Sequence, residues 1–588
     1  MKIRTIVVAF PLMLAAASAA SGQNPFPPYH VERTKILLTG EPAPGIDGAT
    51  VSFLFTPQID GAGNVLIDGY VTGPGITAAN NRAVWHGSAG NLSLVVREGS
   101  PAPGVPGAFI AEGWTVYLSE SGIVAISCFL SGPGVQDGVT DLGTFAGPPE
   151  ALQRIVQAGD PAPSTEPGTV FASNIFFGVQ VSDNGALLLN YDLAGPAIDS
   201  SNDRAMYIGY PDNPQLIWRR GMQAPGCEEG VLFGGADGVV FNDNDQVAFR
   251  CSLMGAGVTS ANNSGYWAGS PESLELIARK GFQAPALPPG VNLFGTSFPG
   301  INYAGWVAFW GGLSGAGVDG TNNHALWVGS PAAPQLVARR GDPAPDAPDG
   351  TVMTVVTVSG NKPINNLEAI AFEATPAGPD VTSENDFAAY LRTSEGTRLV
   401  LRESQMLAQF GSGVALGQGS SKFALTDLGD VVTSTLLSGV GVNADNDNVA
   451  WIRRPSGWWV PLIRSGDILD GRVVLPGSAE EVLPIPNSTG GGDAVLQFAN
   501  DHGAVAGRLV FGDGACGIYV VQGSHVLDVE LDGDIDLSDY AEFPSCFGGP
   551  VGVITSDDCE RFDIDLSGHI DLGDAQVLQE AFSGVTFP

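Results

Sequence analysis

The sequence is short of positive charge. Of its 588 residues, 26 are Lys or Arg and 62 are Asp or Glu, which gives a formal net charge of −36. A nucleic-acid-binding protein needs a basic surface, so that class is excluded. The same acidity would be repelled by anionic lipid, while it favours solubility and attracts cations. Charged residues nevertheless make up only 15% and glycines number 80, which excludes a charge-rich disordered chain and indicates many turns.

Long apolar runs are missing after the start of the chain. The stretch Ile6 to Ala17 is apolar, follows Lys2 and Arg4, and ends at the small residues Ala17-Ser18-Ala19. This pattern predicts a secretory signal peptide over residues 1–22 rather than an anchor helix, because the run is short for a bilayer. No later stretch is long enough to span a membrane. We therefore expect an extracytoplasmic protein that is secreted, periplasmic or attached to the cell surface.

Signatures of catalysis are also absent. The chain has no His-Glu-x-x-His, no Gly-x-Ser-x-Gly, no phosphate-binding loop and no Cys-x-x-Cys, and its six histidines are scattered. Carboxylates abound, so a paired-carboxylate glycosidase stays open as an alternative, but no particular pair stands out and we predict no catalytic residue.

Cysteines are few. Export would permit disulfides, and Cys546 and Cys559 are the most plausible pair because they lie close together in the C-terminal segment. The sequence leaves open how the others pair, namely Cys128, Cys227, Cys251 and Cys516.

What the sequence does contain is an internal repeat marked by two motifs. The first is a turn resembling Arg-x-Gly-Asp-Pro-Ala-Pro-Gly, and the second resembles Asn-x-x-Gly-x-Val-Ala-Phe. The glycine slot of the first falls at Gly40, Gly99, Gly159, Gly221, Gly281, Gly341, Ser404 and Gly466. That of the second falls at Gly63, Gly122, Gly185, Asp245, Gly305, Glu368, Gly429 and Gly503. Eight copies of each motif predict eight units of about 60 residues.

Each unit has room for four short strands. In the fifth unit we expect them near Leu293 to Phe298, Trp306 to Trp310, Ala325 to Val328 and Leu336 to Arg339, because short apolar runs between Gly, Asn and Pro are typical of strands. The Val-Ala-Phe strand is apolar at consecutive positions, which indicates cover on both faces. Such units predict a β-propeller over residues 31–523 rather than a β-solenoid, whose rungs are shorter.

The order of the motifs predicts how the ring closes. The chain opens with a last-strand segment, Thr34 to Thr39, while the eighth unit ends on a middle-strand segment, Gly517 to Val521, with no last strand after it. Pairing the two would remove both open sheet edges. The predicted fold is therefore all-β, an eight-bladed β-propeller closed by an N-terminal strand.

Two recurrent features allow both a functional and a structural interpretation. The motif Asn-Asn/Asp-x-Ala-x-Trp/Tyr, as in Asn80 to Trp85, Asn202 to Tyr207 and Asn322 to Trp327, would suit a ring of sugar contacts. Its recurrence in at least five units favours an Asx-type turn followed by an aromatic packed between blades. An arginine two positions before the first glycine slot predicts a structural ion pair or carbonyl bond at the blade edge. It recurs as Arg97, Arg219, Arg279, Arg339, Arg402 and Arg464.

The composition changes at Ser524, and residues 524–588 form an Asp-rich tail with two matching halves. The loops Asp528 to Asp539 and Asp563 to Asp574 place oxygen-bearing side chains at positions 1, 3, 5, 9 and 12, with Gly at 6 and Ile at 8. Since Ca²⁺ takes six to eight oxygen ligands, this spacing predicts two Ca²⁺ sites rather than a solvated acidic tail. The predicted metal-binding residues are Asp528, Glu530, Asp532, Asp534, Asp536, Asp539, Asp563, Asp565, Ser567, His569, Asp571 and Asp574.

Position 7 of each loop would bind through its backbone carbonyl, so Asp534 and His569 need not use their side chains. Zinc is not expected, because neither loop offers sulfur. Short helical segments are expected at Tyr540 to Phe547 and Ala575 to Phe582, with Pro544 bending or shortening the first.

Residues 31–523 resemble the secreted bacterial tandem-repeat proteins, of choice-of-anchor type, that are named for the N-x-x-G-x-x-A-F motif; Asn302 to Phe309 and Asn242 to Phe249 are the clearest copies. That resemblance implies no known activity. The tail resembles a type I dockerin, which implies paired calcium loops in a small EF-hand-like domain and docking to a cohesin on a scaffold protein. Leu537-Ser538 and Leu572-Gly573 stand where well-known cohesin binders carry a Ser-Thr type pair.

Two functions of different classes follow from these patterns. The first is a secreted, non-catalytic binding or display protein whose calcium-loaded tail attaches it to a cohesin-like or cell-surface protein. The alternative is a polysaccharide-degrading propeller enzyme that carries a dockerin. This alternative is an analogy, because dockerin-like modules often occur in proteins that degrade polysaccharides. A glycan is a candidate ligand in both. An acidic pair in the central channel or on one face, outside the repeat register, would favour the enzyme.

Overall fold

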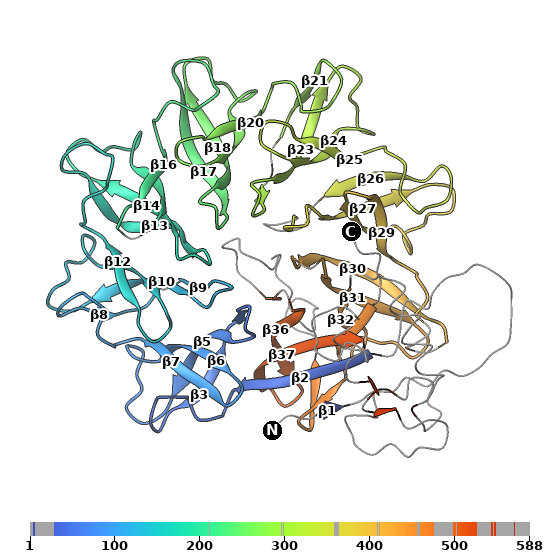
Figure 1. The fold of residues 1–588 in the computed structure, drawn as a ribbon, viewed down its shortest axis with the longest axis horizontal. Coiled ribbons are helices and arrows are strands. Elements are labelled where there is room, and N and C mark those ends of the chain that lie inside the picture. Colours follow the sequence, from blue (N-terminus) through green and yellow to red (C-terminus); the bar gives the residue numbers. More distant parts are fainter. Residues whose placement is uncertain are drawn as a thin grey trace.

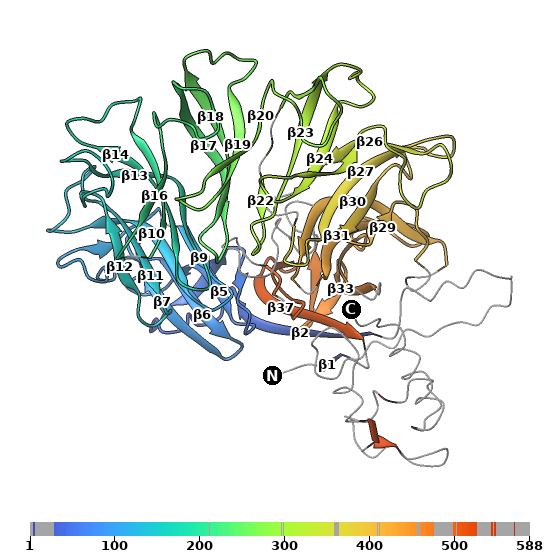
Figure 2. The same cartoon turned by 45° about the horizontal axis from the view of Figure 1, so that its top comes forward.

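The computed structural model describes residues 4–5 and 29–525, with gaps at 114, 211, 296, 298, 358–363, 408–409, 411, 428, 455–458, 476–497 and 501. In the tail it describes residues 543–544, 546–547, 562 and 570. Eight antiparallel sheets stand like blades around a central axis, as Figure 1 shows and the tilted view in Figure 2 confirms. The predicted all-β, eight-bladed propeller is confirmed.

The strands follow one another from blade to blade in chain order. Blade one consists of β3 (Thr50–Leu54), β4 (Gln58–Ile59), β5 (Val65–Thr72), β6 (Arg82–Ser88) and β7 (Asn91–Arg97). Blade two consists of β8 (Phe109–Ile110), β9 (Thr115–Leu118), β10 (Val124–Ser131), β11 (Leu142–Gly147) and β12 (Gln153–Gln157). Blade three consists of β13 (Val170–Val181), β14 (Leu187–Ala194), β15 (Arg204–Gly209) and β16 (Gln215–Arg219). Blade four consists of β17 (Val231–Phe241), β18 (Val247–Gly255), β19 (Ser264–Gly269) and β20 (Glu275–Arg279). Blade five consists of β21 (Val291–Leu293), β22 (Gly300–Ile301), β23 (Val307–Gly315), β24 (His324–Gly329) and β25 (Gln335–Arg339). Blade six consists of β26 (Val352–Thr357), β27 (Ile370–Ala377), β28 (Ala388–Thr393) and β29 (Gly396–Arg402). Blade seven consists of β30 (Val414–Leu425), β31 (Val431–Gly439), β32 (Asn448–Arg453) and β33 (Trp459–Arg464). Blade eight consists of β34 (Ile468–Leu469), β35 (Arg472–Leu475), β36 (Ala504–Phe511) and β37 (Cys516–His525), joined by β2 (Tyr29–Leu38) and β1 (Arg4–Thr5).

The ring closes as the motif order predicts. Strand β2 pairs antiparallel with β37, with Thr34 opposite Val520 and Leu38 opposite Gly517. The N-terminal strand therefore supplies the outer strand of blade eight, and Figure 1 shows the two lying side by side, β2 in blue and β37 in red.

One predicted strand is wrong. In blade five the first strand ends at Leu293 rather than running on to Phe298, and a separate two-residue strand, β22, follows. The backbone N–H groups of Phe294 and Gly295 both donate to the carbonyl of Gly312, at 2.7 and 3.4 Å. Two donors on one acceptor form a bulge, which interrupts the ladder.

The hydrophobic core is divided among the junctions between blades. Each of the eight apolar clusters joins residues of two neighbouring sheets, for example blades four and five. Val307, Ala308 and Phe309 are all fully buried, so the Val-Ala-Phe strand is covered on both faces. Burial at every junction rather than in one centre explains how so long a chain forms a single ring.

The recurrent aromatic residue joins the two repeat motifs. The indole N–H of Trp327 donates to the carbonyl of Pro285 at 2.8 Å, and Trp85 and Trp267 donate to Pro44 and Pro225 in the same way. Each aromatic is fully buried. The packing interpretation is confirmed, since an aromatic with a polar edge needs a buried acceptor and the last proline of the first motif's turn supplies it.

The recurrent asparagine and arginine stabilise the same corner. The Asn80 side chain accepts the N–H of Thr77 at 2.7 Å and donates to the carbonyl of Gly75 at 3.1 Å, which is the expected Asx-type turn. Arg97 Nε donates to the Asn80 carbonyl at 2.8 Å. The structural role of the arginine is confirmed at the corresponding carbonyls by Arg219, Arg279, Arg339, Arg402 and Arg464.

The propeller cysteines are unpaired. Cys128, Cys227, Cys251 and Cys516 are free, and burial raises the pKa of the Cys128 thiol to about 12. Cys546 is disulfide-bonded, and its predicted partner Cys559 lies outside the described residues. Within the part of the chain that the structure describes, no helix has the length and apolar character to cross a membrane.

Candidate functional site

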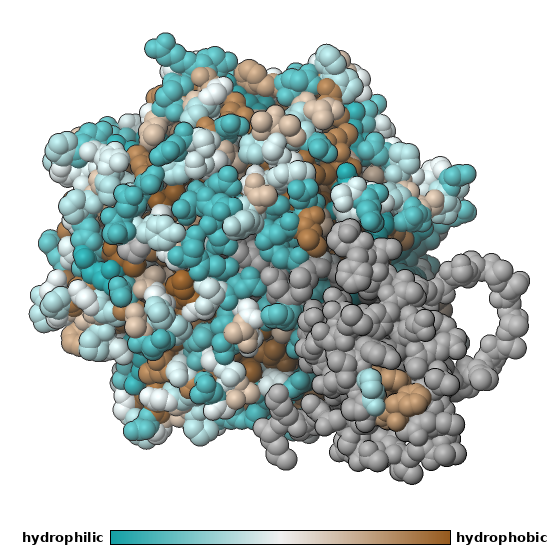
Figure 3. Space-filling view, viewed as in Figure 1, coloured by the Kyte–Doolittle hydropathy of each residue, from teal (hydrophilic) through white to brown (hydrophobic). Residues whose placement is uncertain are grey.

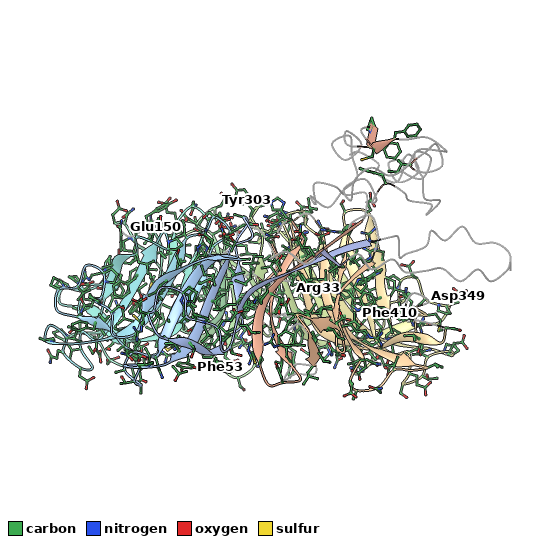
Figure 4. The ribbon with its side chains drawn as sticks, turned by 90° about the horizontal axis from the view of Figure 1, so that it is seen from below. Arg33, Phe53, Glu150, Tyr303, Asp349 and Phe410 are labelled. Carbon is green, nitrogen blue, oxygen red and sulfur yellow. The ribbon has the colours of Figure 1, made fainter. Side chains whose placement is uncertain are left out.

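A groove of about 730 Å³ opens between blades one and two. Its lining comprises Ser52, Phe53, Phe55, Tyr70, Ala78, Asn81, Arg82, Glu98, Glu112 and Gly113. In the edge-on view of Figure 4, Phe53 lies on the lower face of the disc and Tyr303 on the upper face, so the groove and the Asn-x-x-Gly turns occupy opposite faces.

At the groove, one repeat position carries a different residue type from that in blades three and four. In blade three that position is Arg220, whose Nε donates to the Gly234 carbonyl of blade four at 3.2 Å and bridges the two blades. In blade four it is Lys280, whose Nζ lies 5.6 Å from the Phe294 ring centre of blade five. In blade one it is Glu98, a shorter acid whose carboxylate bonds backbone N–H groups of its own blade. No long side chain crosses to blade two, and the junction stays open.

One wall of the groove is aromatic. Phe53 and Phe55 meet edge to face with ring centres 5.0 Å apart, and Tyr70 lies 5.7 Å from Phe55. Phe53 is 40% exposed. In blade four the repeat positions of Phe53 and Tyr70 hold Gly235 and Ser252, so the pair of aromatic residues is not shared with that blade.

Two guanidinium groups lie against the rings of this wall. Arg82 Cζ lies 5.3 Å from the Phe55 ring centre, and Arg508 Cζ lies 5.1 Å from that of Phe53. Arg82 also forms a two-pronged ion pair with the buried Asp68, with Nε and Oδ1 3.0 Å apart. The positive charge of Arg82 is therefore neutralised within the wall.

The groove carries two carboxylates of different exposure. Glu98 is buried, and this burial raises the pKa of its carboxyl, with the charge of Glu112 adding to the effect. Glu112 is exposed. Glu403 occupies the Glu98 position in blade six and likewise has its pKa raised by burial. Because Glu403 has the same repeat position as Glu98, the buried acid is a feature of the repeat. Glu98 and Glu112 are therefore not the acidic pair outside the repeat register that would favour an enzyme.

The other face carries the Asn-x-x-Gly turns, which link blade to blade around the axis. The side-chain amide of Asn242 donates to the carbonyl of Asn302 at 2.8 Å, and that of Asn302 donates to the carbonyl of Asn365 at 3.1 Å. Asn500 donates to the carbonyl of Asp60 at 3.1 Å and joins blade eight to blade one. These buried amides hold the ring together rather than facing a ligand. Figure 3 shows this face as mainly polar, with apolar residues scattered over it.

All twelve predicted calcium ligands, from Asp528 to Asp574, lie outside the described residues. Among the residues that the structure does describe, no three His, Cys, Asp or Glu side chains are grouped as a metal site. Three described residues of the tail, Phe543, Phe562 and Ile570, are buried, and the ring centres of Phe543 and Phe562 lie 5.5 Å apart. Phe543, Pro544 and Cys546 have helical backbone, within the first segment expected to be helical.

The aromatic wall was not identified from the sequence. A signal for it was present, because basic residues at the positions of Arg220, Lys280 and Arg340 give way to Glu98 in blade one. The groove of about 730 Å³ lies at the junction that follows this change of charge type.

The model of a protein family of unknown function, DUF7453, matches residues 29–113, 110–330 and 292–526. No curated protein matches the chain. Solved structures similar to it include an α-L-arabinofuranosidase of Fusarium graminearum in complex with an iminosugar inhibitor (12% identity, TM-score 0.25, covering 62% of this chain and 98% of that one). A puromycin-hydrolyzing peptidase of Mycobacterium tuberculosis has 11% identity and a TM-score of 0.32, covering 75% of this chain and 61% of that one. At these values neither supports an argument about function.

Proposed function

The chain belongs to the DUF7453 family, whose function is unknown, and we propose that its propeller binds a neutral glycan in the groove between blades one and two. The observation that carries the proposal is the aromatic wall of Phe53, Phe55 and Tyr70, placed where blade four has glycine and serine. A volume of about 730 Å³ lies within the usual range for small-ligand sites.

The chemistry of the lining favours a sugar. A sugar ring offers an apolar C–H face for the exposed Phe53 ring and hydroxyl groups for the polar lining, which includes Asn81, Glu98 and Glu112. An acidic ligand is disfavoured, because Arg82 is already paired with Asp68 while two carboxylates face the groove. An organic cation is disfavoured, because guanidinium groups already lie on the faces of Phe53 and Phe55.

The first prediction concerns this wall. Phe53→Ala should weaken glycan binding roughly 10- to 100-fold, because it removes an exposed ring that the sugar would cover. Burying a phenylalanine side chain contributes about 1.5–3 kcal/mol. Isothermal titration of the full chain with cellohexaose, xylohexaose, mannohexaose and arabinohexaose measures the effect. Phe282→Ala is the matched control: Phe282 is 42% exposed and also lies against a guanidinium, 4.6 Å from Arg279 Cζ, but it is outside the groove.

Equal loss in both variants, or no binding of any hexasaccharide by the native chain, contradicts the proposal. Shortening of a bound hexasaccharide by the native chain would instead favour the alternative function, a polysaccharide-degrading enzyme. Glu98→Gln and Glu403→Gln then form the pair that separates a reacting carboxyl from a structural one, because both occupy the same repeat position.

The exported protein is attached through its tail, residues 524–588, which binds two Ca²⁺ ions and contacts a cohesin-like or other cell-surface protein. Support comes from the two loops in the same register, each with oxygen-bearing side chains at the ligand positions. The buried side chain of Ile570, at position 8 of the second loop, is consistent with a loop that packs on the tail's own core.

The second prediction concerns calcium. Two ions should bind per full-length chain, and the tail should become resistant to limited proteolysis, because an ion bound at 100 times its Kd stabilises the folded state by about 2.7 kcal/mol. Asp528→Ala combined with Asp563→Ala should abolish both effects. Asp557→Ala, an acidic residue of the same tail outside both loops, should leave them unchanged. A native chain that retains no calcium after desalting and gains no protection would contradict the prediction.

A further inference from the structure

Arg453, a buried arginine at the end of β32, forms no ion pair with any residue that the structure describes. Arg453 is 7% exposed, and its Nη1 atom is buried without a hydrogen-bond partner. The next residue, Arg454, is also buried and its Nε likewise has no partner, but its charge is compensated: it forms an ion pair with Asp430 at 2.6 Å and donates to the Gly523 carbonyl at 2.7 Å. Adjacent arginines in one chain segment therefore differ in whether their charge is compensated.

The charge closest to Arg453 in its effect is a second cation, whereas Arg454 has an acidic partner. Burial lowers the pKa of its guanidinium to about 10, and the charge that adds to this is another cation, Arg398 of β29 in blade six. A buried charge without a partner costs several kcal/mol. It is unexpected for a chain with 62 acidic residues to leave a buried cation beside a second cation.

The position itself also departs from the repeat. The residue opposite the start of the second strand is glycine in blades one to five, namely Gly87, Gly147, Gly209, Gly269 and Gly329. Each has positive φ, between 122° and 144°. Blade six has Arg392 there and blade seven has Arg453. The glycine of the repeat is thus replaced by arginine in two adjacent blades.

We infer that Arg453 and Arg398 bind an oxyanion at the junction of blades six and seven. The planar guanidinium fork fits a carboxylate, a sulfate or a phosphate, each of which would pair with the free Nη1 edge of Arg453. A bound anion would supply the missing counter-charge, which is the usual explanation for a buried polar group without a partner.

This site is separate from the groove. Arg453 lies opposite Val431, which follows the Asn-x-x-Gly turn of its blade, whereas Phe53 lies opposite Tyr70 at the other end of the corresponding strand. The two sites therefore face opposite sides of the disc, and the inference does not depend on glycan binding.

The test uses the full chain with sodium sulfate, sodium phosphate and sodium acetate, compared with sodium chloride at equal ionic strength. One oxyanion should bind per chain in isothermal titration and raise the melting temperature. Arg453→Met should weaken binding at least 10-fold. Arg398→Gln changes an exposed residue, so it should fold normally and weaken binding several-fold. Arg472→Met, which removes a cation from the exposed pair with Asp513 in blade eight, controls for the lost charge.

Excluded salts stabilise proteins generally, so the variants decide the outcome. If sulfate and phosphate raise the melting temperature of Arg453→Met as much as that of the native chain, the effect is generic and the inference is overturned. It is equally overturned if Arg398→Gln binds with native affinity, or if the native chain shows no saturable heat with any of the three anions. Preference among the three identifies the source of the oxyanion.

Discussion

A chain that lacks residues 1–38 will not form a stable closed ring. Strand β2, Tyr29–Leu38, would be missing, and β37 would lose its outer partner along the whole ladder from His525 to Gly517. The expected result is a protein that aggregates or is rapidly degraded in limited proteolysis. Size-exclusion chromatography and thermal melting by circular dichroism measure it.

The size of the effect follows from what β2 buries. Val31, Ile36, Leu37 and Leu38 are each less than 9% exposed. At about 1.5–3 kcal/mol for each side chain, their loss amounts to roughly 6–12 kcal/mol. That is comparable to the whole stability of a typical folded domain, about 5–15 kcal/mol. The unpaired edge of β37 would also be a template for pairing with other chains.

A chain lacking only residues 1–28 is the control and should melt like the full-length protein, because β2 is intact. A synthetic peptide of residues 29–40 added to the shorter chain should restore its melting transition in proportion to peptide concentration. A chain without residues 1–38 that stays monomeric and melts at the native temperature would contradict closure by this strand.

Arg454→Leu will destabilise the junction of blades seven and eight by about 3–5 kcal/mol, which is the usual cost of breaking a buried ion pair from one side. The guanidinium of Arg454 lies between Asp430 of blade seven and the Gly523 carbonyl of β37, and a Cβ on Gly503 would collide with it. The exposed fractions of Arg454 and Asp430 are 2% and 1%, so water does not replace the lost partner. Urea denaturation measures the change in the free energy of unfolding.

Two comparisons make this second result specific. Arg472→Leu removes the exposed pair with Asp513 in blade eight and should cost less than about 1 kcal/mol. Combining Arg454→Leu with Asp430→Asn should recover part of the loss, because the remaining partner no longer carries a buried charge. Equal costs for Arg454→Leu and Arg472→Leu would show that the buried pair does not hold the junction.

The ring and its closure were predictable from the sequence because they depend on repeated local signals. The Pro-Ala-Pro turn, the Asx-type turn and the buried aromatic recur at fixed spacing, and the surplus last strand at Thr34 matches the one missing after Val521. Each signal recurs in several units, so a single irregular copy does not hide the pattern.

The groove was not predictable in the same way, because it arises from a departure from the repeat. Its lining includes Phe53 and Tyr70, where blade four has glycine and serine, and Glu98, where blade three has an arginine that bridges to the next blade. The break in the first strand of blade five is also local: it follows from two N–H groups that share the carbonyl of Gly312. Such details depend on contacts between residues distant in sequence, which periodicity does not report.

The closure by β2 also has a consequence in time. Strand β2 is made early but finds its partner in the ring only after β37, the last strand of the ring, has been made. During synthesis and export, β2 therefore stays without its partner strand near the N-terminus of the growing chain. Contacts between residues this distant in sequence form slowly. A chain truncated before Cys516 would keep β2 unpaired, because it lacks β37. Cellular proteases could therefore distinguish truncated chains from complete ones.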